Sequence, residues 1–316
     1  MKTKLTLLVA LAVWLALPAR SAELKPYRVG YNSWIGYISL FVAEEKGYFA
    51  DEGLAVTKTS FSSPGDGLKP LLAGDLDAHF TTVDSTIIAL DKAPGQLRVV
   101  YLTDTSAGAD AIVATKDIAT VKDMKGHTVA ATIGECNHLL LVKALQSAGL
   151  TESDIKLVNM NADDAGAAFA AGKLDVAVTW EPWISQVQAA EKGHVIFSSK
   201  QVPNLILDCV TISAATADKK SAETKAFLRA LNRANEFVIA HPDEAAKLNE
   251  KVLEMKAPDI ESMLTKVKLY DRAGNLKELG GAAIPVAKDL AVFFHDRKAT
   301  DSLVDVTKVY DASFLR

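Results

Sequence analysis

Residues 73–82 read AGDLDAHFTT, and residues 171–180 read AGKLDVAVTW. In both copies a glycine ends a helix, and an apolar strand follows the Leu-Asp pair. Each copy closes a longer unit of strand, helix, strand, helix and strand, over residues 27–84 and 128–183. Such alternation predicts a parallel sheet flanked by helices. The repeat therefore predicts two similar α/β lobes, with a ligand cleft between them beyond the carboxyl ends of the strands.

The segments around the repeat divide the chain between these lobes. We expect the first lobe to comprise residues 22–107 and 215–316, and the second lobe to comprise residues 108–214. An apolar strand over 205–214 is expected to lead the chain back toward the first lobe. From residue 221 onward the sequence is mainly helical, and the C-terminal helices are predicted to pack on the first lobe.

The amino-terminal residues are typical of a secretory signal peptide. Two lysines precede an apolar run over residues 5–17, which is too short to span a membrane. We expect cleavage before Ala22, so residues 1–21 form the signal peptide and the mature protein works in the periplasm. The formal charge of −4 becomes −7 when the three basic residues of this segment are removed. Because no basic run is present either, nucleic acid is not an expected partner.

Motifs of known catalytic sites are absent from the sequence. There is no Gly-x-Ser-x-Gly elbow, no His-Glu-x-x-His pair and no phosphate-binding loop. The histidines show no shared ligand spacing and the carboxylates lack the spacing of a calcium loop, so neither a metal nor a cofactor is expected. Cys136 and Cys209 lie in a chain expected to be exported, but their spacing leaves open whether they form a disulfide.

Aromatic and polar residues follow the first strand of each copy. One loop carries Trp34 and Tyr37, and its counterpart in the second copy carries Glu135 and His138. Glycines in these loops let the backbone approach a ligand, and the helix starts that follow offer free N–H groups. We predict that both loops face the cleft. Alternatively, Trp34 and Tyr37 pack against the first helix.

A second aromatic motif follows the last strand of the second copy and consists of Trp180, Glu181, Pro182 and Trp183. Two indoles around a carboxylate are typical of a wall that stacks on a flat or cationic group. Alternatively, the motif packs between the lobes and Glu181 caps the next helix. Predicted strand ends also carry three aspartates, which either contact the ligand or cap helices: Asp84, Asp110 and Asp208.

Several motifs together resemble one known family. They are the loop 34–37 with the helix that follows it to residue 49, the turn 73–77, the motif 180–183, and residues 225–227 leading to His241-Pro242. Over nearly all of its mature length, the chain is similar to the periplasmic binding proteins of the nitrate, taurine and aliphatic sulfonate ABC importers. That group also includes binders of thiamine precursors.

The resemblance implies a two-lobed type II periplasmic binding protein that closes on a small solute. It implies a membrane permease and an ATPase as partners, and a monomer, since both lobes of a hinged receptor must face the permease. An enzyme is not expected, because the cysteine cluster of the thiamine-pyrimidine synthase relatives is absent. The binding positions of the family transfer to Trp34, Tyr37, Asp84, Glu135, Trp180, Glu181 and Asp208.

The expected cleft residues favour a small cationic or nitrogen-rich solute, such as an amine, a guanidinium or a pyrimidine. A buried anion needs donors or positive charge, and no Arg falls at a predicted strand end. The stretch 131–144 also resembles family branches associated with guanidine or urea-type solutes. The main alternative is a binder of taurine, aliphatic sulfonate or nitrate. Less favoured are an enzyme like the thiamine-pyrimidine synthases and a sensor subunit that contacts a signalling partner.

Overall fold

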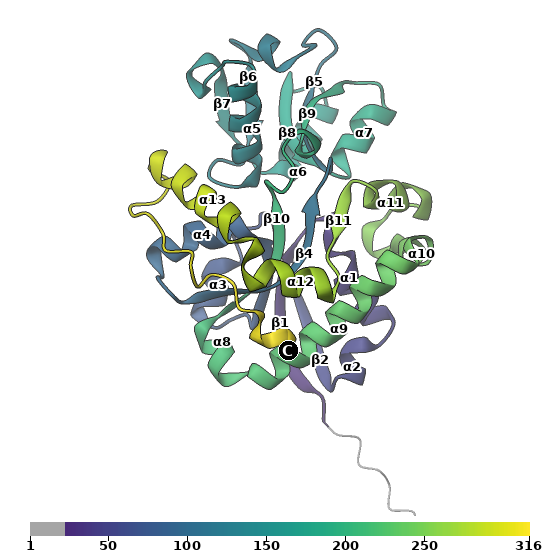
Figure 1. The fold of residues 1–316 in the computed structure, drawn as a ribbon. Coiled ribbons are helices and arrows are strands. Elements are labelled where there is room, and N and C mark those ends of the chain that lie inside the picture. The colour runs from purple at the N-terminus through teal and green to yellow at the C-terminus, as the bar shows by residue number, and fades with distance from the viewer. Residues whose placement is uncertain (1–22) are drawn as a thin grey trace, which may run out of the picture.

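The computed structural model of the protein describes residues 23–316, which form two α/β lobes (Figure 1). Each lobe has a central β-sheet with helices packed against it. This arrangement confirms the two-lobed α/β architecture predicted from the repeat. The predicted signal peptide, residues 1–21, lies outside the described residues.

Six strands form the sheet of the first lobe, in the order β11 (Val267–Leu269), β4 (Leu97–Ser106), β10 (Leu207–Ser213), β3 (Ala78–Thr82), β1 (Lys25–Asn32) and β2 (Leu54–Phe61). Strand β1 pairs in parallel with β2 and β3, as the repeat predicts. Strand β10 lies antiparallel between β3 and β4, and β11 is antiparallel to β4. The sheet is therefore mixed, not mainly parallel throughout.

Five strands form the sheet of the second lobe, in the order β7 (Lys156–Asn159), β6 (Thr128–Ala131), β8 (Val176–Trp180), β5 (Asp110–Ala114) and β9 (His194–Ser198). Strands β6, β7 and β8 are parallel, whereas β5 is antiparallel to both β8 and β9. The helices of this lobe are α5 (Cys136–Ser147), α6 (Ala162–Ala170) and α7 (Trp183–Ala189), with short helical turns at Val121–Met124, Glu152–Asp154 and Ser199–Gln201.

The helices of the first lobe come from both ends of the chain. Those before β4 are a single turn at Ile35–Tyr37, α1 (Ile38–Glu45), α2 (Tyr48–Asp51), α3 (Leu68–Ala73) and α4 (Val83–Lys92). Those after β10 are α8 (Ala214–Lys219), α9 (Ser221–Ala240), α10 (Pro242–Leu253), α11 (Ala257–Leu264), α12 (Arg272–Lys277), a turn at Glu278–Ala282, α13 (Ile284–Asp296) and a turn at Ala312–Leu315. As predicted, the C-terminal helices pack on the first lobe (Figure 1).

Aromatic side chains join the long helix α9 to the first sheet. Phe227 stacks on Tyr27 of β1 at 5.0 Å between ring centroids and on Phe49 of α2 at 5.3 Å. Phe80 of β3 meets the same ring edge-on at 6.3 Å. All four rings are buried, and large aromatic side chains contribute strongly to core energetics. The C-terminal helices are therefore part of the core of the first lobe.

The chain crosses between the lobes twice, at residues 107–109 and between β9 and β10. The two crossings touch, because the Ser106 and Ser199 hydroxyls lie 2.7 Å apart and the Gly108 N–H donates to the Ser199 hydroxyl at 2.7 Å. We expected the second lobe to extend to residue 214, but β10 belongs to the sheet of the first lobe. Every residue of β10 is buried, because the strand fills the space between β3 and β4.

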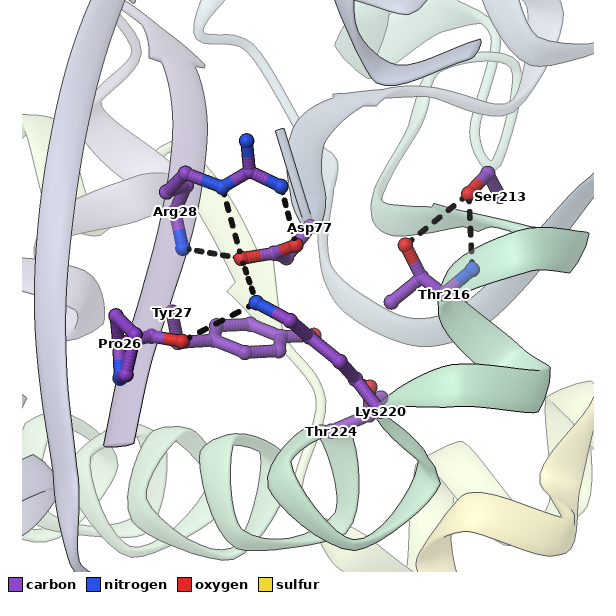
Figure 2. A network of polar contacts seen from close by, with 8 residues as sticks. All are labelled: Pro26, Tyr27, Arg28, Asp77, Ser213, Thr216, Lys220 and Thr224. Carbon is purple, nitrogen blue, oxygen red and sulfur yellow. Dashed lines mark hydrogen bonds and ion pairs between the residues drawn. The ribbon is translucent and has the colours of Figure 1, made fainter. Parts of the chain in front are cut away.

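Asp77, the last residue of the first AGDLD copy, anchors the first lobe (Figure 2). Its carboxylate accepts the Arg28 backbone N–H at 2.8 Å, the Arg28 guanidinium at 2.8 and 3.2 Å, and the Lys220 ammonium at 2.8 Å. Burial alone would raise the pKa of Asp77, but the bonds from Arg28 and Lys220 outweigh it and lower that pKa. The counterpart in the second copy, Asp175, is exposed and lies 3.6 Å from His127.

Replacing Asp77 with Ala should lower the free energy of unfolding by about 2–3 kcal/mol, because Arg28 and Lys220 lose a buried, charged acceptor. Chemical denaturation at pH 7 measures this effect. Because the folded pKa is lowered, the contribution is present above the unfolded pKa and disappears as the pH falls through the folded value. Asp175→Ala is the matched control and should change stability by less than about 0.5 kcal/mol. Equal losses in the two variants would contradict the prediction.

Candidate functional site

A small cavity of about 10 Å³ lies between the lobes, which is room for about one water molecule. Its lining combines residues of both lobes with two that follow the second crossing. The lining residues are Asn32, Trp34, Pro64, Thr82, Asp110, Cys136, Trp180, Ile206 and Asp208. Four of the predicted site residues are in this set, namely Trp34, Asp110, Trp180 and Asp208.

Strand polarity explains why aspartates and strand ends meet at the cavity. Thr82 ends β3, and Asp208, near the start of the antiparallel β10, pairs with it. In the same way Trp180 ends β8, and Asp110 at the start of the antiparallel β5 pairs with it. An antiparallel strand starts beside the end of the strand that it pairs with. Asp208 of the first lobe and Asp110 of the second therefore both lie at the cleft.

Five carboxyl groups lie on or beside the cavity and are short of neutralising charge. Burial raises the pKa of Asp84 to about 6 and the pKa values of Asp104, Asp110 and Glu135 to about 7. Burial, together with the nearby Asp104 and Asp110 charges, holds the pKa of Asp208 well above its usual range. Among the described residues that line the cavity, none is Lys or Arg. Burial therefore favours the protonated forms of these five carboxyl groups.

The polar atoms left without a partner around the cavity are nearly all acceptors. They are Asn32 Oδ1, both Asp84 oxygens, Asp110 Oδ2, Glu135 Oε2 and Asp208 Oδ2, with Asn137 Nδ2 as a donor. Asp84, Asp110 and Asp208 are at most 3% exposed. Buried polar groups usually find partners, so these oxygens are the atoms of the site that lack hydrogen bonds.

Two indoles form one wall of the cavity, one from each lobe. The rings of Trp34 and Trp180 meet edge-on, with centroids 6.3 Å apart. The Trp34 Nε1–H is shared between the two oxygens of Asp104 at 3.1 and 3.3 Å, and Trp180 Nε1–H donates to Asp163 at 2.7 Å. Each indole is thus held by a carboxylate that does not line the cavity.

Two other predicted residues stand next to the cavity and support it. The Tyr37 hydroxyl lies 2.9 Å from Asp208 Oδ1 and 3.1 Å from the Thr81 carbonyl oxygen, so Tyr37 orients Asp208 from behind. Glu135 of the second lobe reaches across the cleft, where its Oε1 accepts from the Ser63 hydroxyl at 2.8 Å and the Gly65 N–H at 3.3 Å. The cavity is closed on that side by an interlobe contact.

Three predicted residues point elsewhere. Glu181 is buried, accepts from the Ser185 N–H and hydroxyl at 3.0 Å each, and forms an ion pair with Lys266. His138 lies 2.7 Å from Glu152 and accepts the Gly134 N–H at 3.2 Å. Trp183 donates its indole N–H to Asp163 at 2.9 Å. None of the three lines the cavity, and Glu181 occupies the packing role that we considered as the alternative.

Several residues of the site were not singled out from the sequence. Asn32 and Thr82 end strands, so the rule that pointed to Trp180 also applies to them. Cys136 follows Glu135 in the loop that we predicted to face the cleft, whereas Pro64 and Ile206 carry no such signal. The supporting Asp104 lies near the end of β4, and Asp163 lies in the first turn of α6. Their roles depend on contacts with residues far away in the sequence.

Gly36 keeps Trp34 and Asp104 together, since a Cβ at this position would collide with the Asp104 carboxylate and the Trp34 indole nitrogen. Gly36→Ala should therefore displace the indole and cost about 1–3 kcal/mol of stability. Denaturation followed by tryptophan fluorescence reads both effects. Gly280→Ala is the control, because nothing lies within 4 Å of its added methyl group. An unchanged emission spectrum in Gly36→Ala would contradict the prediction.

Comparison with known proteins matches the chain to a family. The family model described as NMT1/THI5 like matches residues 34–245. The chain belongs to this family. NMT1/THI5-like relatives include a Bacillus subtilis protein named for binding aliphatic sulfonates, 27% identical over 93% of this chain and 88% of the relative. A similarly named Escherichia coli protein is 25% identical over 96% and 94%.

The solved structure of the periplasmic aliphatic sulphonate binding protein of Escherichia coli has the same fold as this NMT1/THI5-like chain. The TM-score is 0.75 at 22% identity, covering 92% of this chain and 99% of that one. The predicted family is thereby confirmed, and the fold is that of a periplasmic binding protein. The names of these relatives support the sulfonate alternative and do not support the cation that we preferred from the sequence.

Two further observations concern the chain between residues 23 and 316. Cys136 and Cys209 are both buried and free. Within this range no helix combines the length and apolar character needed to cross a membrane, and no cluster of three or more His, Cys, Asp or Glu side chains is arranged to hold a metal.

Proposed function

We propose that this protein is the solute receptor of an ABC importer, working in the periplasm and delivering its cargo to a membrane permease and an ATPase. The family, the fold of the periplasmic relative and the two adjacent crossings between lobes support this function. A cavity lined from both lobes fits a receptor that closes on its solute, because a ligand that contacts both lobes favours the closed state.

The proposed cargo is a small cation rich in N–H donors, such as an amine or a guanidinium. The observation that carries this proposal is the set of unpartnered acceptor atoms around a cavity without a lining Lys or Arg. Buried carboxylates cost free energy unless they are protonated or paired. In a cleft opened beyond its present room for one water molecule, a guanidinium would pair Asp110 and Asp208 through charge-assisted bonds while its flat face lies near the Trp34 and Trp180 indoles.

An aliphatic sulfonate is the second candidate, and the names of two relatives that the chain matches along 88% and 94% of their length favour it. A sulfonate would bring three acceptor oxygens to a wall that already holds Asp110 and Asp208. It would bind only while these groups keep their protons and donate them. The charge of the cargo therefore decides between the candidates.

Three compounds of similar size separate the candidates, namely ethylammonium, taurine and ethanesulfonate. Each of these compounds, and guanidinium, is titrated calorimetrically into the protein from residue 22 to 316. The first three share a two-carbon chain, so their affinities compare an ammonium end with a sulfonate end. Binding of ethylammonium or guanidinium without ethanesulfonate supports the cation. Binding of ethanesulfonate without the cations overturns it and supports the sulfonate. Taurine alone would indicate that both ends are recognised, which also contradicts a purely cationic cargo.

A further inference from the structure

Asp163 is a carboxylate outside the cavity that nevertheless touches its aromatic wall. It lies in the first turn of α6, where Oδ1 accepts Trp180 Nε1–H at 2.7 Å and Trp183 Nε1–H at 2.9 Å. The start of α6 is fixed to β8, because the Thr179 hydroxyl donates to the Ala162 carbonyl at 2.7 Å. These contacts all lie inside the second lobe, so they do not depend on whether the lobes are open.

The other oxygen of Asp163 makes a bond of a different kind. Its Oδ2 accepts from the hydroxyl of Ser33, which belongs to the first lobe and is exposed at the rim of the cleft. The next residue, Trp34, touches Trp180 through the edge-on indole contact. Separation of the lobes would break the Ser33 bond while leaving both indole bonds in place.

We propose that Asp163 is a positioning residue that links lobe closure to the orientation of the indole wall. An interaction shifts a two-state equilibrium only if it differs between the states, and the Ser33 bond exists only in the closed one. The indole bonds place the carboxylate before closure, so closing requires little reorganisation. The proposal depends on the proposed closure of the lobes on a solute but not on the charge of that solute.

The cysteines allow this to be tested without any solute. The Cys136 side chain lines the cavity and is 2% exposed, so a thiol reagent reaches it only when the lobes open. Cys209, fully buried in β10, reacts only when the first lobe unfolds and reports on global stability. Labelling of the solute-free protein with N-ethylmaleimide, with each cysteine resolved by peptide mass spectrometry, measures the two rates separately.

We expect Ser33→Ala to raise the Cys136 labelling rate about fivefold to tenfold, the population shift that follows loss of one hydrogen bond to a carboxylate. The Cys209 rate should not change. Asp163→Asn should raise the Cys136 rate at least as much, and it should also shift the tryptophan emission. Three of the four tryptophans, Trp34, Trp180 and Trp183, belong to this cluster, and the fourth lies in the predicted signal peptide.

The control is Asp164→Asn, which changes the adjacent residue. Asp164 is exposed, and its carboxylate accepts from Asn161 at 2.6 Å within the helix cap. This variant should leave the Cys136 rate and the emission unchanged. In the double variant Ser33→Ala/Asp163→Asn, Cys136 should be labelled no faster than in Asp163→Asn alone, because both substitutions remove the same Ser33–Asp163 bond. Equal Cys136 rates in Ser33→Ala and the unaltered protein, or additive effects in the double variant, would overturn the proposal whatever the cargo is.

Discussion

Replacing Asp110 with Asn should weaken the binding of ethylammonium or guanidinium about 100-fold while raising the melting temperature of the solute-free protein. Asp110 is 1% exposed, its Oδ2 has no partner, and burial raises its pKa to about 7, with the Asp104, Asp84 and Glu181 charges adding to the effect. A hydrogen bond to a charged group contributes up to about 3 kcal/mol, which corresponds to about two decades in affinity. Without a solute, burial and the repulsion from its neighbours outweigh the one hydrogen bond that this charge receives from Ser106.

The opposite signs of these two effects separate a binding role from a structural one. A carboxylate that merely caps a helix would lower the melting temperature when it is lost and leave affinity unchanged. The control is Glu181→Gln, a buried carboxylate that Lys266 and Ser185 already satisfy outside the cavity. It should lower stability and change cation affinity less than about threefold. Tighter ethanesulfonate binding by Asp110→Asn, with no cation binding by either protein, would support the sulfonate candidate.

The pH dependence of affinity should be large and should reveal the charge of the cargo. A cation binds after cavity carboxyls release their protons, and burial holds the pKa values of Asp110 and Glu135 at about 7. For each proton displaced from a group with such a pKa, affinity should rise about 100-fold between pH 5 and pH 8. A sulfonate would show the reverse slope. Calorimetry in two buffers of different ionisation enthalpy checks the number of protons released.

Stability of the solute-free protein should follow the opposite course. The folded pKa values of Asp84, Asp110 and Glu135 are raised above the unfolded values near 4, so the folded state binds more protons between about pH 4 and pH 7. Stability should therefore fall as the pH rises through this window, and saturating cation should remove the fall. A shallower slope in Asp110→Asn than in the unaltered protein would assign part of the slope to that residue, because Asp84 and Glu135 still titrate in the variant.

The two lobes could be predicted because both copies of the repeat show the same order of strands and helices in their sequence patterns. The repeat could not show which strands pair with the apolar strand 207–213. The sequence of this strand does not distinguish a position at the edge of the second sheet from one at the centre of the first. Its place between β3 and β4 follows from the completed first lobe. The antiparallel strands β5 and β10 each follow a crossing between lobes, which contributes to the mixed character of both sheets.

The candidate site was predictable where strand ends determine position. That rule led to Trp34, Trp180, Asp110 and Asp208, all of which line the cavity. It did not reveal that Lys266, which is 85 residues from Glu181, would satisfy that carboxylate. Contacts between distant segments decide whether a polar residue faces a ligand or a neighbouring side chain. Such contacts cannot be predicted from the sequence of one strand and its loop.

The second lobe is a contiguous insertion between β4 and β10, and this has a consequence for biogenesis. A chain that emerges amino-terminus first presents all of residues 110–198 before β10 appears, so the inserted lobe can acquire its complete sheet early. At that stage the sheet of the first lobe still lacks β10, the strand that lies between β3 and β4. The first lobe should therefore fold second, after β10, β11 and the C-terminal helices of its core have also been synthesised.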